Sequence, residues 1–279
     1  MHNLLDGKVI ASQYRRQLKA QVAELSKRGV TPSVVIYYIG EDASADLYFN
    51  AKRKLAADLG ILAYARRFER IEEELLIRQI ENCNENCEID GICIELPLPP
   101  ALDAQRVRRA VTPDKDVDGI NPTSLGRLIV GQTALPPATP MAVIELMRAK
   151  DIRFEGKDAV IVGRSEVVGT PLALLLMREN ATVTVCHSKT QNLVAKTLGA
   201  EILCVAVGKP GFIRADMVRE GAIVIDIGVN VTPQGLVGDV AFDEVQPKAQ
   251  WITPVPGGVG PMTSTLVMQN VIQSARRRL

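Results

Sequence analysis

Apolar residues follow two alternating spacings along the first half of the chain. Segments in which they recur every three to four positions predict helices, and short runs rich in β-branched and aromatic residues predict strands. In chain order this gives a helix at 10–27, a strand at 33–39, a helix at 47–59, a strand at 61–68, a helix at 72–82 and a strand at 91–96. Helices and strands in alternation predict a mainly parallel α/β sheet.

The second half repeats this alternation with strands that are almost continuously apolar. Such strands are typical of a parallel sheet that helices cover on both faces. They lie at 159–163, 182–186, 201–207 and 222–227, and helices are expected at 141–149, from about 169, and at 263–278.

A proline-rich stretch at 135–140 separates the two halves. The length of 279 residues suits two domains of ordinary size. We therefore expect an α/β fold with two parts. The first is a three-layer α/β domain of residues 1–138, to which a C-terminal helix at 263–279 returns. The second is a Rossmann-like parallel-sheet domain of residues 139–262, with the active-site cleft between the two.

Composition and charge are those of an ordinary globular protein. Hydrophobic residues make up 47% and charged residues 23%, and a net charge of +1 indicates neither nucleic acid nor a membrane as partner. The N-terminus lacks the basic and apolar segments of a secretory signal, which predicts a cytoplasmic protein. Five cysteines and two histidines form no disulfide framework and offer too few ligands for zinc, so no metal is expected. Cys93, Cys186 and Cys204 are interpreted as small buried apolar residues.

The turn after the first strand of the second half has glycine at both ends, in the run Gly163-Arg164-Ser165-Glu166-Val167-Val168-Gly169. A dinucleotide pyrophosphate binds at such a strand-to-helix turn, on the N-terminus of the helix. The spacing departs from G-x-G-x-x-G, so the position between a buried strand and a helix carries the prediction. Gly208-Lys209 and Gly228-Val229 follow the third and fourth strands, at the sheet edge where ligands gather.

The end of the next strand distinguishes between the two nicotinamide dinucleotides. NAD-preferring folds place Asp or Glu there, whereas this strand ends in Cys186-His187-Ser188-Lys189-Thr190. Arg164, Ser188 and Lys189 offer hydrogen bonds for a 2′-phosphate, which favours NADP over NAD. Taken singly, Lys189 is equally a solvated loop charge and His187 a filler at the strand end.

A second group of candidates lies in the first half. Tyr48 and Lys52 are four residues apart on a predicted helix, so both project from one face. They form either a site for a flat ring next to an amine, or a buried tyrosine beside a lysine that reaches solvent. The segment Glu95-Leu96-Pro97-Leu98-Pro99 follows a buried strand as a stiff wall, and Asp118 is the carboxylate of the 114–119 turn expected to point inward.

The run from Ile252 to Thr263 combines proline with glycine. Proline fixes φ and glycine permits close backbone approach, so this segment is a rigid connector, a wall against a ligand, or both. Its Val255-Pro256 bond is a candidate for the cis isomer, as is a bond within Leu96-Pro97-Leu98-Pro99.

Taken in order, these motifs resemble one family. They are Tyr48-x-x-x-Lys52, Leu96-Pro97-Leu98-Pro99, the turn at 114–119, Gly126-Arg127-Leu128, the glycine turns at 163–169 and 207–211, the segment 224–228, and the run at 253–263. Across nearly the whole chain they are similar to bifunctional methylenetetrahydrofolate dehydrogenase/methenyltetrahydrofolate cyclohydrolase. The resemblance implies a folate-binding catalytic domain and an NADP-binding domain. It implies oxidation of 5,10-methylenetetrahydrofolate with NADP⁺ to the methenyl cation, hydrolysis to 10-formyltetrahydrofolate, a place in one-carbon metabolism and purine biosynthesis, and a homodimer.

The resemblance also implies a role for each candidate residue. Lys52 is the catalytic lysine, Tyr48 stacks on and orients the folate, and Asp118 accepts hydrogen bonds from pterin N–H groups. The other residues that contact the folate are Leu96, Pro97, Leu98, Pro99, Pro256, Gly257, Gly258 and Val259. The cofactor contacts are Gly163, Arg164, Ser165, Val168, Gly169, His187, Ser188, Gly208, Lys209, Gly228 and Val229, with Arg164 and Ser188 on the 2′-phosphate.

Four residues of the folate pocket depart from the family pattern, which has serine at Ala45, glutamine at Glu95, asparagine at Ser124 and glycine at Ala142. Glu95 belongs to the predicted catalytic set because the glutamine it replaces partners the lysine. A carboxylate next to an ammonium raises the pKa of the lysine, which makes the lysine a poorer general base near neutral pH. The hypothesis is that hydride transfer survives while the cyclohydrolase step is weakened.

Two other interpretations stay open. The pocket departures allow a homologue that binds folate or nucleotide without turnover. Another two-domain NAD(P)-dependent dehydrogenase with an N-terminal lysine would explain everything except the Pro/Gly run. A short-chain dehydrogenase is excluded, because its Tyr-x-x-x-Lys pair follows the glycine turn in the same domain, whereas Tyr48 precedes Gly163.

Overall fold

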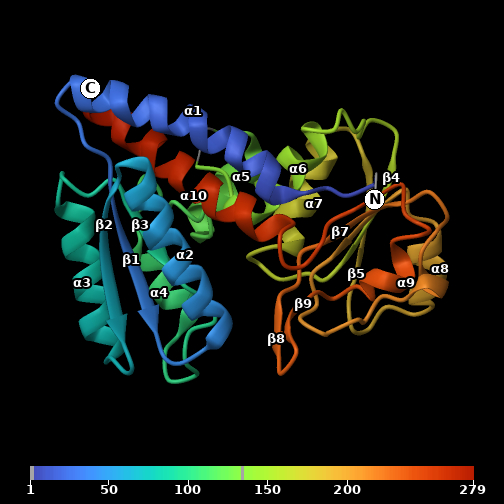
Figure 1. Cartoon of the computed structure of the whole chain (residues 1–279). Coiled ribbons are helices and arrows are strands. Elements are labelled where there is room, and N and C mark those ends of the chain that lie inside the picture. The colour runs from blue at the N-terminus through green and yellow to red at the C-terminus, as the bar shows by residue number, and fades with distance from the viewer. Residues whose placement is uncertain (1–2, 133–134) are drawn as a thin grey trace. The chain divides into compact units, whose positions relative to one another are not determined.

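The computed structural model describes residues 3–132 and 135–279, which form two compact units (Figure 1). The first unit comprises Ser12–Ala138 and Ser264–Leu279, and the second comprises the described part of Met1–Ala11 with Thr139–Thr263. The sequence-based division placed the N-terminal residues in the first domain, and here the structure differs. Leu5 N donates to Ile252 O at 2.9 Å and Ile252 N donates to Asn3 O at 3.0 Å. The start of the chain therefore pairs with the edge strand of the second unit that contains Ile252.

The first unit is a small parallel sheet between helices (Figure 1). Its strands have the order β2-β1-β3, and all pairs are parallel. Helices α3 and α4 pack on one face, and α2 packs on the other, where the rings of Tyr38 and Phe49 are 5.6 Å apart. The elements are most of α1 (Gly7–Lys27), β1 (Ser33–Ile39), α2 (Ala43–Leu59), β2 (Leu62–Phe68), α3 (Glu73–Glu85), β3 (Gly91–Ile94), α4 (Ala104–Ala110), α5 (Pro122–Val130), most of α10 (Val259–Ala275) and η2 (Arg276–Arg278).

Helix α2, which carries Tyr48 and Lys52, has a strong signal at each end. The Asp42 carboxylate accepts hydrogen bonds from Ser44 N at 3.0 Å and Ala45 N at 2.9 Å, which satisfies two of the free N–H groups of the first turn. Gly60, with φ of 83°, ends the helix in the left-handed conformation that glycine adopts most easily. These caps fix the register of the helix that positions the lysine.

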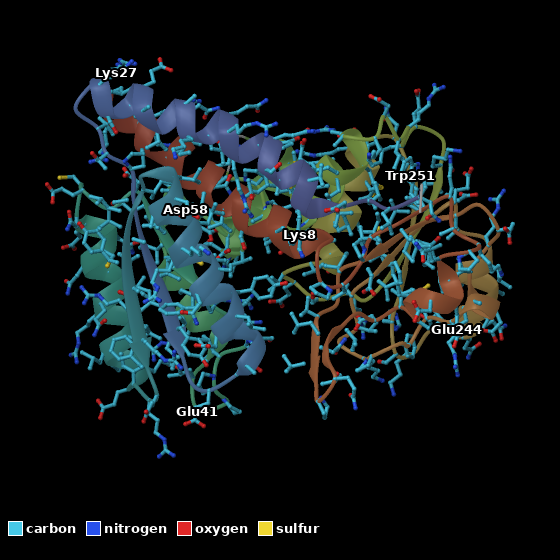
Figure 2. All side chains as sticks on the ribbon, viewed as in Figure 1. Lys8, Lys27, Glu41, Asp58, Glu244 and Trp251 are labelled. Atoms are coloured by element: carbon cyan, nitrogen blue, oxygen red, sulfur yellow. The ribbon has the colours of Figure 1, made fainter. Side chains whose placement is uncertain are left out.

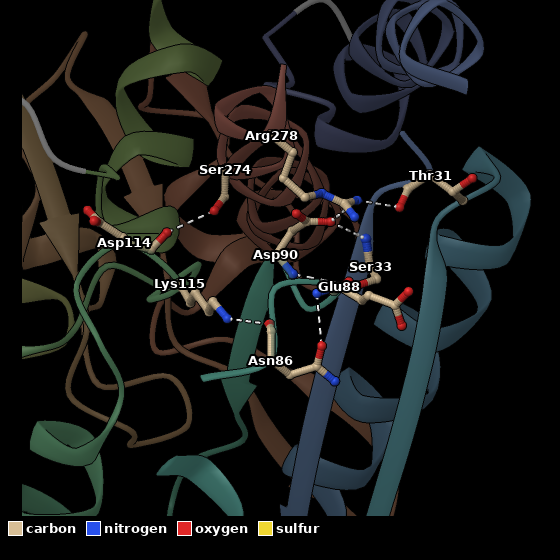
Figure 3. Close-up of polar contacts among 9 residues, drawn as sticks. All are labelled: Thr31, Ser33, Asn86, Glu88, Asp90, Asp114, Lys115, Ser274 and Arg278. Carbon is tan, nitrogen blue, oxygen red and sulfur yellow. Dashed lines mark hydrogen bonds and ion pairs between the residues drawn. The ribbon is translucent and has the colours of Figure 1, made fainter. Parts of the chain in front are cut away.

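The C-terminal segment is fastened to the sheet of the first unit by polar contacts (Figure 3). The Arg278 guanidinium donates to Thr31 O at 2.7 Å and to Asp90 Oδ2 at 2.9 Å. Asp90 Oδ2 also accepts Ser33 N at 2.8 Å, at the start of β1. A buried carboxylate is costly without such donors, so the pair ties the last residues of the chain to β1.

The second unit is a five-stranded parallel sheet of order β10-β7-β6-β4-β5, with a small antiparallel hairpin, β8–β9. Strands β4, β6 and β7 are buried, as their apolar sequences predict. Strand β5 was expected to be covered on both faces as well, but it lies at the edge of the sheet and is largely exposed. The elements are α6 (Ala138–Arg148), β4 (Asp158–Val162), α7 (Gly169–Arg178), β5 (Thr182–Cys186), α8 (Leu193–Leu198), β6 (Ile202–Val205), η1 (Ala215–Met217), β7 (Ile223–Asp226), β8 (Asn230–Thr232), β9 (Gly235–Val237), α9 (Phe242–Val245) and β10 (Trp251–Ile252).

The strand order creates a switch point beside β4. From β4 the chain moves to β5 on one side and then crosses to β6 on the other. In open α/β sheets, ligands bind at the carboxyl ends of the strands at such a point. The turns after β4, β5 and β6 are therefore the part of this unit best placed to hold a ligand.

The predicted α/β architecture with parallel sheets is confirmed, and the strands at 33–39 and 182–186 have the predicted bounds. Helix α10 begins at Val259, four residues earlier than expected. Pro261 lies in its first turn, where a missing N–H costs nothing. In the described part of the chain, no helix is both long enough and apolar enough to cross a membrane.

Candidate functional site

Lys52 is the centre of a buried polar group that we call the lysine cluster: Lys52, Cys93, Glu95 and Asp118. The lysine is only 5% exposed. Its Nζ lies 3.0 Å from Glu95 Oε1, 3.1 Å from Cys93 Sγ and 3.6 Å from Asp118 Oδ1. The interpretation of Lys52 as a lysine that reaches solvent is therefore wrong, because the ammonium is enclosed by acceptors within the first unit.

Three elements bring the lysine cluster together. Lys52 projects from α2, Cys93 lies in β3, and Glu95 follows that strand, where its N–H still bonds to Tyr37 O at 2.9 Å. Asp118 lies in the turn that Gly119 closes with φ of 68°. A Cβ on Gly119 would lie 2.6 Å from the Pro137 backbone, so this turn requires glycine.

The electrostatics of the lysine cluster favour the ammonium form of Lys52. Burial alone lowers the pKa of a lysine, but the charges of Asp118 and Glu95 outweigh it and hold the pKa of Lys52 well above its ordinary value. Burial also raises the pKa of Glu95, against the opposing effect of Lys52. Burial, with the Asp118 charge, raises the pKa of the Cys93 thiol well above its usual range, so this sulfur stays protonated.

One oxygen of the lysine cluster lacks a partner. Asp118 Oδ1 faces the ammonium, whereas Oδ2 is buried and accepts no hydrogen bond from any described residue. Buried polar atoms are rarely left in this state, and an ionised carboxylate can only accept. Asp118 is thus poised to receive an N–H donor from a bound molecule.

Tyr48 lies one turn before Lys52 on α2 and is half-buried. Burial raises the pKa of its phenol, and Lys52 opposes this effect. The Leu96–Pro97 bond that follows Glu95 is cis, which confirms that candidate. Within the proline segment, Leu98 packs against the core beneath α3 and α4, whereas Pro97 is exposed.

In the second unit, the turn after β4 is compact. Gly163 has φ of 127°, and a Cβ there would lie 2.2 Å from Ala206 O. A Cβ on Gly169 would lie 2.2 Å from Gly163 O, at the N-terminus of α7. Ser165 Oγ accepts the N–H of Val168 at 3.1 Å. Both glycines are therefore needed to bring strand, turn and helix this close, as in a phosphate-binding turn.

The end of β5 offers positive charge and a hydroxyl. Arg164, Ser188 and Lys189 are exposed, and neither cation forms an ion pair with a described residue. His187 shapes the turn, because its N–H donates to Thr190 Oγ1 at 2.8 Å and its Nδ1 accepts Lys189 N at 3.1 Å. Arg164 and Lys189, neither in an ion pair with a described residue, follow the neighbouring strands β4 and β5 together with the Ser188 hydroxyl, and such a set fits a phosphomonoester such as the 2′-phosphate of NADP.

The turns after β6 and β7 contact Asp239, a residue that follows β9 and that the sequence analysis missed. The N–H groups of Gly208 and Lys209 point at the Asp239 carboxylate, at 2.9 and 2.8 Å. A Cβ on Gly228 would lie 2.1 Å from Asp239 Cγ, and Val229 follows, half-buried. Asp239 is 30 or more residues from Gly208 and Lys209 in the sequence, so no local signal pairs it with this turn. Cys93 was correctly interpreted as buried, but its contact with Lys52 was missed.

The Pro/Gly run packs tightly within the second unit. Val255–Pro256 is cis, as the sequence allowed, and Gly257 has φ of 115°. Gly257 O accepts the N–H of Lys8 at 3.2 Å, at the start of α1 (Figure 2). A Cβ on Gly258 would lie 2.6 Å from Pro254 O. These glycines are explained by packing, and the contact of Pro256, Gly257, Gly258 and Val259 with a ligand, like the cleft between the domains, stays a prediction.

Comparison with known proteins gives one consistent result. Residues 5–118 match the family described as "Tetrahydrofolate dehydrogenase/cyclohydrolase, catalytic domain", and residues 137–279 match its "NAD(P)-binding domain". A protein of Thermodesulfovibrio yellowstonii named "Bifunctional protein FolD" is 46% identical over 275 residues, covering 98% of this chain and 96% of that protein.

Two solved structures extend the comparison. The bifunctional FolD methylenetetrahydrofolate dehydrogenase/cyclohydrolase of Campylobacter jejuni is 38% identical with a TM-score of 0.95, covering 99% of each chain. The Trypanosoma brucei enzyme, solved with NADP cofactor and inhibitor, is 34% identical with a TM-score of 0.93, covering 98% of this chain and 97% of that one.

Proposed function

We propose, since this chain belongs to the tetrahydrofolate dehydrogenase/cyclohydrolase family, that it oxidises 5,10-methylenetetrahydrofolate to 5,10-methenyltetrahydrofolate with NADP⁺ and hydrolyses that cation to 10-formyltetrahydrofolate. The observation that carries the proposal is the lysine cluster. A buried Lys52 with two carboxylates on its Nζ lies inside the part of the chain that matches the catalytic domain. A buried ion group of this kind is costly to maintain and is typical of active sites.

The geometry supports a division of roles at the folate site. Asp118 Oδ2, buried and without a partner, accepts N–H groups of the pterin ring. Tyr48, half-buried one turn from Lys52, presents a neutral ring against which the flat pterin stacks. Leu96, Pro97, Leu98 and Pro99 directly follow Glu95, and we assign this segment to the wall of the same pocket.

NADP⁺ is the proposed cofactor. When bound, it accepts the hydride from the methylene carbon. Arg164, Ser188 and Lys189 hold its 2′-phosphate, because they are exposed, unpaired with described acids and placed at the switch point. The relative from T. brucei was solved with NADP, which supports this choice over NAD.

The hydrolytic step needs a base. A water oxygen bonds to the methenyl carbon while one of its protons passes to a base. The remaining hydroxyl proton then moves to the ring nitrogen as the bond between that nitrogen and the carbon breaks, which leaves the formyl C=O. Lys52 is the proposed proton acceptor, but its pKa is held well above the ordinary value, so little of it is neutral near pH 7. We therefore propose that Glu95 weakens hydrolysis relative to hydride transfer.

Both half-reactions test the proposal directly. The purified chain should reduce NADP⁺ in the presence of methylenetetrahydrofolate, with a lower kcat/KM for NAD⁺. Lys52→Met should abolish hydrolysis, whereas Glu88→Gln, an exposed glutamate of the same unit, should change neither reaction. If NADP⁺ binds and no turnover occurs, the chain is a binding homologue and the enzymatic proposal is wrong.

Two further expectations belong to this proposal. We propose a homodimer in the cytoplasm whose formyl product serves purine biosynthesis, as the family resemblance implies. Light scattering of the purified chain and fractionation of the source cells test assembly and location. A monomer at micromolar concentration would refute the first.

A further inference from the structure

The Asp239 carboxylate collects four hydrogen-bond donors. It follows the β8–β9 hairpin, and the residue is fully buried. Its Oδ2 accepts the N–H groups of Val207 at 2.6 Å and Gly208 at 2.9 Å. Its Oδ1 accepts Lys209 N at 2.8 Å and Asn230 Nδ2 at 2.9 Å. Three successive backbone N–H groups that converge on an anion form a concave binding site, and here a side chain of the protein fills it.

A second buried carboxylate holds the first in place. Asp226, at the end of β7, accepts Asp239 N on Oδ1 and Val240 N on Oδ2, both at 2.9 Å. The N–H of Asp226 itself donates to Thr253 Oγ1 at 2.7 Å. The backbone that carries Asp239 is therefore fixed to the central sheet by Asp226.

Neither carboxylate has room to move. A Cβ on Gly238 would lie 1.8 Å from Asp226 Oδ2, and one on Gly228 would lie 2.1 Å from Asp239 Cγ. Among the described residues, no lysine, arginine or histidine forms an ion pair with Asp226 or Asp239. Backbone N–H groups supply most of the hydrogen bonds to the Asp239 carboxylate, and those of Asp239 and Val240 donate to the Asp226 carboxyl. Such groups bind carboxylates strongly when several converge.

This arrangement links the two turns at the carboxyl ends of β6 and β7. The turn at 207–209 directs all its N–H groups inward to Asp239, and Asn230, at the start of β8, bonds to the same carboxylate. Both turns lie at the sheet edge that the proposed function assigns to the cofactor. The conformation of both turns thus depends on one side chain, which is 30 or more residues from the turn at 207–209 and nine residues from Asn230.

We propose that Asp239 is a positioning residue for the nicotinamide dinucleotide. It holds the turn at 207–209 in the conformation that receives the cofactor, and Asp226 holds Asp239. The proposal rests on the proposed function for the identity of the ligand. Asp239 does not touch the ligand itself, because its oxygens are already occupied by donors of the protein.

The test compares Asp239→Asn with the wild-type chain, using calorimetric titration of NADP⁺ and steady-state kinetics. An asparagine keeps one acceptor oxygen and turns an NH₂ group toward the N–H donors, so the turn loses part of its anchor. If one molecule in about ten keeps the competent turn, the Kd and KM for NADP⁺ rise about tenfold. The KM for methylenetetrahydrofolate should stay within about twofold, because Lys52, Tyr48 and Asp118 of the folate site lie in the other unit.

Two further variants keep the test decisive. Asn230→Ala removes one donor from Asp239 Oδ1 and should raise the Kd for NADP⁺ about two- to threefold, without the risk of a buried unpaired carboxylate. Glu201→Gln is the matched control. The Glu201 carboxylate also accepts a backbone N–H, from Asp158, but it lies at the amino ends of β4 and β6. Glu201→Gln should therefore leave the Kd for NADP⁺ unchanged.

The outcomes separate the inference from the proposed function. A folded Asp239→Asn with wild-type affinity for NADP⁺ overturns the inference. If that variant does not fold, an unchanged Kd in Asn230→Ala overturns it instead. A wild-type chain that binds NADP⁺ without turnover refutes the enzymatic function, while the Kd comparison still decides the role of Asp239. A wild-type chain that does not bind NADP⁺ overturns both.

Discussion

Replacing Glu95 with glutamine removes one charge from the lysine cluster and little else. The amide has nearly the shape of the carboxylate, so its Oε1 can still accept from Lys52 Nζ, now 3.0 Å away. Among the described residues, Asp118, with Oδ1 at 3.6 Å, is then the one carboxylate left on the ammonium. The change therefore isolates the effect of charge on the proton affinity of Lys52.

The magnitude follows from the distances. Unit charges 3.0 Å apart interact by about 5 kcal/mol at an effective dielectric constant of about 20. Part of this is already offset in the wild type, because burial penalises the Glu95 carboxylate and raises its pKa. Asp118 and Glu95 together hold the pKa of Lys52 up, so removing the charge of Glu95 should lower that pKa. Each unit by which the pKa falls increases the neutral fraction of Lys52 near pH 7 about tenfold.

The assay is the hydrolysis of purified methenyltetrahydrofolate, followed by the loss of its near-ultraviolet absorbance between pH 6 and 9. We expect kcat for hydrolysis to rise at least about tenfold in Glu95→Gln, and its pH profile to move to lower pH. Hydride transfer should stay within about threefold, and Glu88→Gln should match the wild type in both reactions. A wild-type hydrolase already as fast as its dehydrogenase, or a pH profile that Glu95→Gln leaves in place, would refute the reasoning.

Three further predictions concern the second unit. Burial raises the pKa of Asp226 to about 7 from an ordinary 3.8, so the folded state holds this proton more tightly than the unfolded state does. The free energy of unfolding should therefore fall by about 4 kcal/mol as pH rises from about 4 to 7. Denaturant titrations across this range should show a smaller fall in Asp226→Asn than in the wild type. Arg164→Ala should raise the KM for NADP⁺ about 10- to 100-fold and leave that for NAD⁺ nearly unchanged, and equal losses for both cofactors would contradict a 2′-phosphate contact. Gly163 has φ of 127°, and a Cβ there would lie 2.2 Å from Ala206 O, so Gly163→Ala should lower the free energy of unfolding by more than about 2 kcal/mol in urea titrations. A Cβ on Gly221 would meet no atom within 4 Å, so Gly221→Ala should lower it by less.

The central strands of the parallel sheets could be predicted because they are buried on both faces, whereas the outer strands β2 and β5 are largely exposed. A strand such as β6 is apolar at every position and stands out from the helices around it. Short elements gave no such signal. Helix α8 has six residues and each strand of the β8–β9 hairpin has three, so too few positions exist for a periodicity to emerge. Tertiary contacts, not local pattern, determine these elements.

The candidate site divides along the same line. Lys52 and Asp118 were identifiable because each belongs to a local motif. The contact between Lys52 and Cys93 depends on how α2 lies on the sheet, which no spacing encodes. The role of Asp239 was still harder to predict, because the backbone N–H groups that it accepts in the 207–209 turn are 30 or more residues away in the sequence. The effect of Glu95 could be predicted, in contrast, because this carboxylate stands in a recognisable local motif where the family has a neutral glutamine.

The negative charge of Glu95 affects both half-reactions. With Lys52, Glu95 and Asp118 all ionised, the three side chains sum to one negative charge, whereas a glutamine at position 95 would make the sum zero. Hydride loss turns a neutral methylene bridge into a cation, and fixed negative charge near a developing cation lowers the barrier to its formation. Attack by water consumes that cation, so the same charge stabilises the reactant of hydrolysis and also keeps the proposed base protonated. Glu95 therefore favours oxidation and opposes hydrolysis through one property, and the ratio of the two rates should change more in Glu95→Gln than either rate alone.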